Sequence, residues 1–197
     1  MYAEEIELLK KNFQGEAFHI EMGKFYNRQE KQSQAIEELN KALEINPNSE
    51  LAHFEMGNVC LKLRDELQAE KEYRRSLELN PHFFDASLEL GKIYYYRKRR
   101  PDLATAEFNK VILESPSDWE ANYLLGKIYK ERQEYKLAIE RLEQASEADP
   151  NREQIYFELG KAYRDMDMPD LAIKQFEKVL TISNNRENVF IKNKALN

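Results

Sequence analysis

Residues 125–150 read LGKIYKERQEYKLAIERLEQASEADP, and this stretch decides the fold. Its apolar residues recur three and four positions apart, which places them on one face of a helix. Two small residues, Gly126 and Ala138, interrupt the larger ones, and the stretch ends at Pro150. A proline ring cannot continue the helix that precedes it, so the second helix ends before Pro150. The stretch predicts a helix-turn-helix unit.

Three marker residues of this unit recur along the chain at a nearly constant spacing. The glycines are Gly23, Gly57, Gly91, Gly126 and Gly160. The alanines are Ala35, Ala69, Ala104, Ala138 and Ala172, and the prolines are Pro47, Pro81, Pro116 and Pro150. Each step is 34 residues, except for one step of 35 that all three markers take in the same repeat. Because independent markers slip together, the chain contains a true internal repeat with one extra residue between Gly91 and Ala104.

Each unit resembles a tetratricopeptide repeat (TPR), a helix-turn-helix of about 34 residues. In repeat one the matching residues are Met22, Gly23, Tyr26, Ala35, Leu39, Ala42 and Pro47, and in repeat four they are Leu125, Gly126, Tyr129, Ala138, Leu142, Ala145 and Pro150. Other repeats depart from the pattern at Cys60 (usually tyrosine), Ser76 and Val111 (usually alanine) and Asn184 (usually proline). The usual tryptophan at the fourth position is replaced by His19, His53, Ser87, Asn122 and Tyr156.

The resemblance implies an all-α fold, a right-handed superhelical α-solenoid of helix-turn-helix repeats. The predicted segments are a capping helix at 1–15, TPRs at 16–49, 50–83, 84–118, 119–152 and 153–186, and a cap or tail at 187–197. The small residues predict a close approach of the two helices in each repeat. Pro101 and Pro169 predict the first positions of second helices, where a missing N–H costs nothing.

The two ends of the array are predicted to be capping elements, because a solenoid needs polar outer faces at its ends. Residues 1–14 have an amphipathic pattern, with Ile6, Leu9 and Phe13 on one stripe. A shorter helix is predicted at residues 187–196, with Val189, Phe190 and Ile191 as its apolar residues.

Composition excludes several classes of protein. The net charge of −6 opposes nucleic-acid binding by the molecule as a whole. A single cysteine, Cys60, allows no intramolecular disulfide. The sequence has neither the pattern of a secretory signal nor an apolar run long enough for a membrane span, so we expect no membrane insertion and a cytoplasmic location.

Family resemblance implies a ligand groove formed by the first helices of the repeats. The predicted groove residues are Ile20, Lys24, Asn27, Phe54, Asn58, Leu61, Leu88, Lys92, Tyr95, Tyr96, Tyr123, Lys127, Lys130, Phe157, Lys161 and Arg164. An apolar series at the fifth position of each repeat runs beside a basic series at the ninth. This pattern predicts a protein or peptide ligand that is acidic and has apolar or aromatic anchors.

An alternative interpretation of the groove lysines is purely structural. Lys24, Lys92 and Lys161 each follow a glutamate by three residues, and such pairs stabilise a helix by a few tenths of a kcal/mol. One family subtype does not match: Ile20, Phe54 and Leu88 stand where the two-carboxylate clamp of co-chaperone TPR domains has a lysine.

The stretch YYYRKRRPD, residues 94–102, combines aromatic and basic residues. Tyr94 falls at a core position of the repeat, and the basic run Arg97, Lys98, Arg99 and Arg100 falls at the turn between two helices. We interpret the run as an exposed, slightly lengthened turn. It is also a possible docking turn for an acidic or phosphate-bearing partner, while nucleic acid is the least favoured ligand because one run is a small footprint.

Residue patterns for catalysis, metal binding or cofactor binding are absent from the sequence. His19 and His53 lie one repeat apart at the fourth position, which indicates packing, and Cys60 stands at a core position. We therefore expect a non-enzymatic scaffold without cofactors that binds a partner in its concave groove. The main alternative is a structural protein that assembles into homo-oligomers through its terminal helices.

Overall fold

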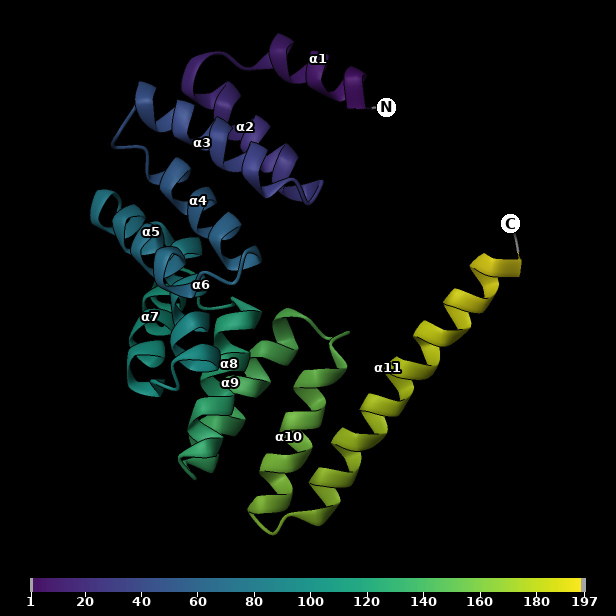
Figure 1. The fold of residues 1–197 in the computed structure, drawn as a ribbon. Helices are drawn as coiled ribbons and strands as arrows, with labels where there is room; N and C mark the ends of the chain where they lie inside the picture. Colours follow the sequence, from purple (N-terminus) through teal and green to yellow (C-terminus); the bar gives the residue numbers. More distant parts are fainter. Residues whose placement is uncertain (1, 196–197) are drawn as a thin grey trace. The chain divides into compact units, whose positions relative to one another are not determined.

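All secondary structure between residues 2 and 195 is helical, which confirms the predicted all-α class. The computed structural model describes the backbone of residues 2–195 and the side chains of residues 4–184. The elements are α1 (Tyr2–Asn12), α2 (Gly15–Arg28), α3 (Gln32–Ile45), α4 (Glu50–Lys62), α5 (Glu66–Leu79), α6 (Phe84–Lys92), the π-helical turn η1 (Ile93–Arg97), α7 (Pro101–Glu114), α8 (Trp119–Glu131), α9 (Tyr135–Ala148), α10 (Glu153–Asp165) and α11 (Pro169–Ala195) (Figure 1).

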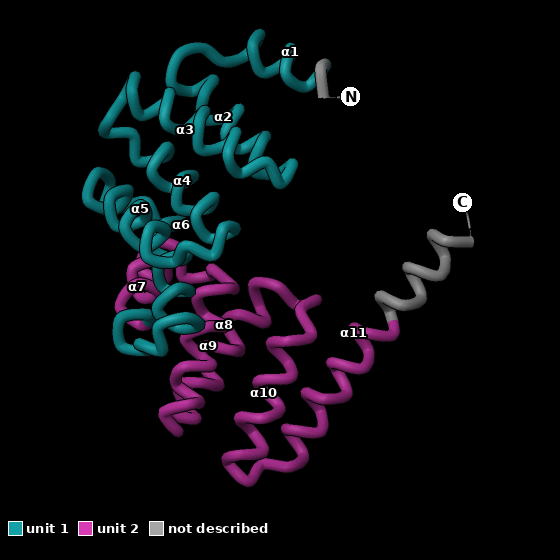
Figure 2. Tube along the Cα trace, viewed as in Figure 1, with its two compact units in different colours: residues 1–104 teal, residues 105–197 magenta. Residues whose placement is uncertain are grey.

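Two compact units make up the chain, Met1–Ala104 and Thr105–Asn197 (Figure 2). The boundary between them falls within α7. In the first unit, α2 packs on α3 and α4 on α5, and in the second unit α8 packs on α9 and α10 on α11. Each of these pairs is a helix-turn-helix hairpin, the repeating unit of an α-solenoid.

Glycines allow the two helices of a hairpin to touch. A Cβ atom added at Gly57 would lie 2.6 Å from the ring of Tyr73, and one at Gly126 would lie 2.6 Å from Cγ of Leu142. Real Cβ atoms do not approach other atoms this closely, so only glycine fits against these fully buried side chains. The predicted close approach within the repeats is confirmed.

The turns at both ends of the second helices follow from local chemistry. In each repeat the residue two positions before the second helix has a left-handed backbone. Its φ is positive at Glu30, Arg64, Arg99, Gln133 and Asp167. At the other end, Asn46 precedes Pro47 and has an extended backbone, as a residue before proline prefers. Its side-chain oxygen accepts the N–H of Asn48 at 3.1 Å, which closes the turn.

The fourth position of the repeat supports the turn before it, although the usual tryptophan is missing. Asn122 Nδ2 donates to the carbonyl of Pro116 at 2.8 Å, and the Tyr156 hydroxyl donates to the carbonyl of Pro150 at 3.1 Å. His53 Nε2 lies 3.3 Å from the carbonyl of Pro47. Three different side chains thus perform one structural task, which confirms the packing role predicted for His53.

The extra residue of repeat three is accommodated in a helix. In repeat five the N–H of Met168 donates to the carbonyl of Tyr163 at 3.0 Å, whereas in repeat three Arg100 donates to Tyr94 at 2.9 Å, one residue further along. The left-handed residue, Arg99, keeps its place two residues before the proline. The insertion therefore widens the end of the helix into η1. The sequence had predicted a lengthened turn, and this prediction was wrong.

The last helix differs from the prediction. α11 runs without a break from Pro169 to Ala195, so the segment 187–195 continues the second helix of repeat five and is not a separate short helix. The physical reason is Asn184, which stands where the other repeats have the proline that ends the second helix. The side chains of Val189, Phe190 and Ile191 lie outside the described residues.

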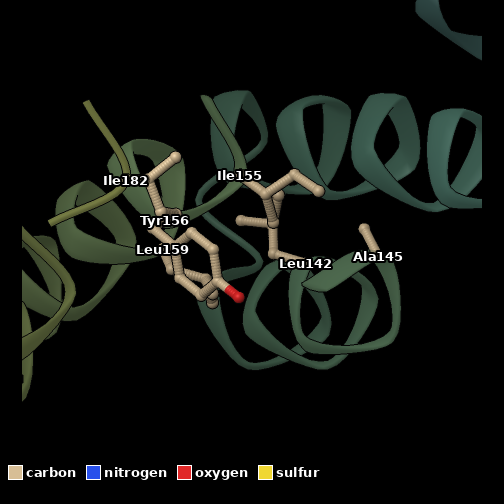
Figure 3. Close-up of a cluster of buried hydrophobic side chains, with 6 residues drawn as sticks. All are labelled: Leu142, Ala145, Ile155, Tyr156, Leu159 and Ile182. Atoms are coloured by element: carbon tan, nitrogen blue, oxygen red, sulfur yellow. The ribbon is translucent and has the colours of Figure 1, made fainter. Parts of the chain in front are cut away.

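The core of the second unit lies between α9, α10 and α11. Figure 3 shows its buried side chains, which are Leu142, Ala145, Ile155, Tyr156, Leu159 and Ile182. In the first unit α1 packs against α2, and Glu5 of α1 accepts from Arg28 at 3.2 Å. No helix in the described part of the chain is long and apolar enough for a membrane crossing.

Candidate peptide-binding face

The first helices of neighbouring hairpins lie side by side within each unit. We call the surface that they form in each unit the first-helix face of that unit: α2, α4 and α6 with η1 in the first unit, and α8 and α10 in the second. α2 contacts α4, and α8 contacts α10. All predicted groove residues belong to these helices. Within a repeat, the fifth, ninth, twelfth and thirteenth positions share one side of the first helix.

Three groove lysines are paired with glutamates one turn earlier. Lys24 Nζ lies 2.8 Å from Glu21 Oε1, Lys92 Nζ lies 2.5 Å from Glu89 Oε1, and Lys161 Nζ lies 3.1 Å from Glu158 Oε1. The predicted i, i+3 pairs are therefore present, and ligand binding by these lysines stays a prediction. Because each pair keeps part of its surface exposed, pairing leaves the ammonium groups accessible to a ligand.

Between the first two repeats, Lys62 ties one first helix to the next. Its Nζ donates to the backbone carbonyl of Asn27 at 2.6 Å, near the C-terminus of α2. A cation is favourable there because the last carbonyls of a helix have no partner in the helix. Asn27 itself is only 8% exposed, so it contributes a carbonyl to this contact and little side-chain surface to a ligand.

A pocket opens on the first-helix face of the first unit. It has a volume of about 500 Å³ and is lined by Leu61 of α4, Glu89 and Lys92 of α6, and Ile93, Tyr96 and Arg97 of η1. Three of these residues, Leu61, Lys92 and Tyr96, are predicted groove residues. Tyr96 is half exposed and its ring lies 4.7 Å from that of Tyr95.

In the second unit a buried carboxylate holds two lysines. Glu158 of α10 is 8% exposed and forms ion pairs with Lys130 of α8 and with Lys161. Burial alone would raise the pKa of Glu158, but the hydrogen bonds and charges of both lysines outweigh it and lower the pKa. The ion pair of Lys130 with Glu158 links α8 to α10. Because its pKa is lowered, Glu158 carries a negative charge at neutral pH.

The groove positions of α8 and α10 are mainly basic. Lys127, Lys130, Lys161 and Arg164 stand there with Glu131 and Asp165. Lys130 and Lys161 form ion pairs with Glu158, and Arg164 contacts Asp165 at 2.9 Å. This basic character has a sequence cause. Leu124 occupies the sixth position of repeat four, where the other repeats have Glu21, Glu55, Glu89 and Glu158, so Lys127 follows no glutamate by three residues.

Aromatic rings accompany these cations. Lys127 Nζ lies 5.6 Å from the ring centre of Tyr123, and Lys161 Nζ lies 5.3 Å from that of Phe157. These distances are typical of cation–π contacts. Phe157 is 49% exposed, so an apolar ring and an excess of positive charge are presented together.

The apolar fifth position is divided between core and surface. Ile20 is 3% exposed and packs with Ala42 and Ala52 in the core of the first unit. Phe54 lies against the rings of Tyr73 and Phe83 at 5.7 and 4.9 Å. These two side chains have a structural role, whereas Phe157 offers surface to a ligand.

Acidic residues of α5 engage the basic turn. Arg97 Nε lies 3.4 Å from Glu66, and Lys98 forms an ion pair with Glu70. Burial alone would raise the pKa of Glu70, but its contacts with Lys98, Tyr94 and Arg74 lower it. Arg99 and Arg100 are exposed. Two of the four basic residues are thus paired with carboxylates of α5. This pairing weakens the interpretation of the run as a nucleic-acid site.

Cys60 lies in the core, where burial, and then the charges of Glu72 and Asp65, raise the pKa of its thiol to about 11. A thiol with so high a pKa is almost fully protonated at neutral pH and is a poor nucleophile. His19 Nδ1 lies 2.7 Å from Glu38, an interhelical contact within repeat one. Within residues 4–184 no group of three metal-binding side chains gathers.

Sequence reasoning missed the role of Glu158. It assigned this residue only to Lys161 on the same helix, whereas the structure also brings Lys130 to it from 28 residues away. The local sequence held no signal for this contact, because Lys130 belongs to α8 and Glu158 to α10.

Family models match most of the chain. A model described as "TPR repeat" matches residues 23–63 and 126–167, and two described as "Tetratricopeptide repeat" match residues 54–118 and 153–186. Comparison with curated protein sequences gave no match.

Several solved structures share the fold. MamA from Desulfovibrio magneticus RS-1, described from residue 41 to its end, is 24% identical, with 86% of this chain and 96% of that chain covered and a TM-score of 0.76. YrrB, described as a TPR protein with an unusual peptide-binding site, is 18% identical. The match covers 95% of this chain and 96% of that chain, with a TM-score of 0.72. PilF from Pseudomonas aeruginosa is 21% identical. The match covers 84% of this chain and 75% of that chain, with a TM-score of 0.76.

Proposed function

The chain belongs to the tetratricopeptide repeat family, and we propose that it is a non-enzymatic scaffold whose first-helix face binds an acidic segment of a partner protein. The observation that carries the proposal is the mainly basic groove positions of α8 and α10, with Lys127, Lys130, Lys161 and Arg164, in a chain that is acidic overall. Neighbouring cations repel one another, which costs free energy. The same cations attract the carboxylates of an acidic ligand.

Apolar surface beside the cations supports a protein ligand over a small anion. Phe157 is half exposed next to Lys161, and Tyr123 lies beside Lys127. An acidic peptide with an aromatic or aliphatic anchor would bury these rings and pair its carboxylates with the lysines. The description of the structurally similar YrrB as a peptide-binding TPR protein fits this proposal.

The proposal is tested by reversing charges at groove positions. Lys127→Glu with Arg164→Glu changes the groove, and Arg164 is 63% exposed. A matched control, Lys136→Glu with Lys174→Glu, makes the same change in net charge on exposed positions of α9 and α11. All three proteins are used to capture partners from a lysate of the source cells, and helical content is compared by circular dichroism.

We expect at least one protein to be retained by the wild type and the control but lost from the groove variant. Its affinity for the purified wild type should fall as salt rises, because exposed charge pairs are screened. Retention of the same proteins by all three forms would contradict binding at the first-helix face.

A second candidate is self-assembly, and the end of repeat five favours it. Ile139 and Tyr123 of repeat four pack against the core cluster between α9 and α10. The residues 34 positions later are Ile173 and Phe157, which are 56% and 49% exposed. Leu180 on α11 is 63% exposed as well. This outer face keeps the apolar character of a repeat-to-repeat contact, which a second copy of the chain would cover.

A further inference from the structure

The pocket on the first unit lies where repeat three carries its extra residue. The extra residue is taken up by η1, a π-helical turn that is wider than an α-helical one. Ile93, Tyr96 and Arg97 of η1 line the pocket together with Glu89 and Lys92 of α6. A π-helical turn is rare and is found frequently at functional sites.

The chemistry of the pocket has two parts. Leu61, the buried Ile93 and the half-exposed ring of Tyr96 provide apolar surface. Lys92, Arg97 and Glu89 provide charge, with one more cation than carboxylate. Arg97 is oriented by Glu66 of α5 at 3.4 Å, yet 60% of its side chain stays exposed.

We propose that this pocket is a selectivity pocket, which receives an aromatic side chain of the partner segment while Arg97 and Lys92 bind a carboxylate next to it. The proposal rests on the proposed function and names the anchor that the acidic ligand carries. A volume of about 500 Å³ admits a phenylalanine or tyrosine side chain. The ring of Tyr96, already tilted against Tyr95, would pack against it.

The occupant follows from charge complementarity. The pocket has net positive charge, and the chain continues into Lys98, Arg99 and Arg100 directly after it. A basic side chain would meet Arg97 and Lys92 and be repelled. A neutral apolar segment would fill the pocket but leave the cations without new partners. An aromatic residue flanked by Asp or Glu satisfies both parts.

Synthetic peptides provide the probe. One set consists of dodecapeptides of Asp, Glu and Ser with a single central Phe, and a matched set has Ala in place of Phe. Affinities for the wild-type protein are measured by fluorescence anisotropy. We expect the Phe peptides to bind about tenfold more tightly than the Ala peptides, as burial of one aromatic side chain implies.

Deletion of Tyr96 tests the role of the insertion. It restores the 34-residue spacing and leaves Lys92 to Pro101 as KIYYRKRRP, the same length as KAYRDMDMP in repeat five. Because four of the five repeats fold with this spacing, we expect the helical content to be retained. The deletion variant should bind Phe and Ala peptides with equal affinity, at the level of the Ala peptides on the wild type.

A point variant guards against a folding defect. Tyr96→Ala keeps η1 and removes a side chain that is 51% exposed, and it should reduce the preference for Phe by at least threefold. The matched control is Ile45→Ala on α3, at a side chain that is 55% exposed and lies outside the pocket. This control should keep the full preference.

The outcomes separate the two proposals. Acidic peptides that bind the wild type without a preference for Phe, or a preference that survives both Tyr96 changes, would overturn the selectivity pocket and leave the proposed function standing. Failure of the wild type to bind any acidic peptide would overturn the proposed function, and the pocket assignment with it.

Discussion

At the scale of single residues, the chain pairs charges that sequence periodicity alone would keep apart. Glu158 is the clearest case, since it is almost fully buried and bonded to Lys130 and Lys161. A buried carboxylate with two ammonium partners stabilises the contact of α8 with α10 only while it is charged. The same residue also limits the positive charge that the first-helix face offers to a ligand.

The lowered pKa of Glu158 predicts a pH dependence of stability. An unfolded glutamate has a pKa of about 4.3. Because the folded pKa is lower, the contribution is fully present above that value and is lost as pH falls through the folded pKa. Glu158→Gln should lower the free energy of unfolding at pH 7 by about 2 kcal/mol, and the difference from the wild type should shrink toward pH 3.

Urea denaturation at pH 7, 5, 4 and 3 measures this dependence. Glu147→Gln, at an exposed position of α9, is the control and should follow the wild type at every pH. A constant difference between Glu158→Gln and the wild type across the series would mean that the charge of Glu158 does not stabilise the fold.

At the scale of elements, one residue determines where a helix ends. The second helices of repeats one, two, three and four stop before a proline, and α11, which has Asn184 in its place, runs to Ala195. The residue before a proline is forced toward an extended backbone, and the proline ring collides with the preceding turn.

Asn184→Pro should therefore end α11 near Ser183. Far-UV circular dichroism should lose the signal of roughly 10 helical residues. The contacts of repeat five should survive, because Ile182, the last buried residue of its core cluster, precedes the change. Asn184→Ala keeps the helix and is the control. An unchanged spectrum for the proline variant would show that packing, and not the missing proline, sets the end of α11.

At the scale of the whole molecule, the exposed outer face of repeat five predicts association. Ile173→Ser with Leu180→Ser removes the two most exposed apolar side chains of that face and leaves the buried cluster intact. If the chain self-assembles through this face, sedimentation velocity should show a concentration-dependent oligomer for the wild type and a monomer for the variant.

Ile45→Ser with Leu63→Ser removes similarly exposed side chains from α3 and from the C-terminal end of α4 and is the control. It should associate like the wild type. A wild type that is monomeric at high concentration, or a variant that associates as strongly as the wild type, would exclude this face as the interface.

The sequence by itself determined the repeats, the helical class and the small residues that let helices touch. These features are local and periodic, so they can be read wherever a glycine, alanine and proline recur in step, as Gly57 and Gly126 do. It also predicted the side of the first helices on which the groove residues lie, because helix periodicity orients them.

Only the tertiary structure decided how the charges of that face are shared. Lys130 finds Glu158 across two helices and 28 residues, and Ile20 is drawn into the core while Phe157 stays exposed. The structure likewise placed the extra residue in η1, where it forms part of a pocket, and not in the turn. Such outcomes depend on which helices lie side by side, and contacts between distant residues have no signature in a local pattern.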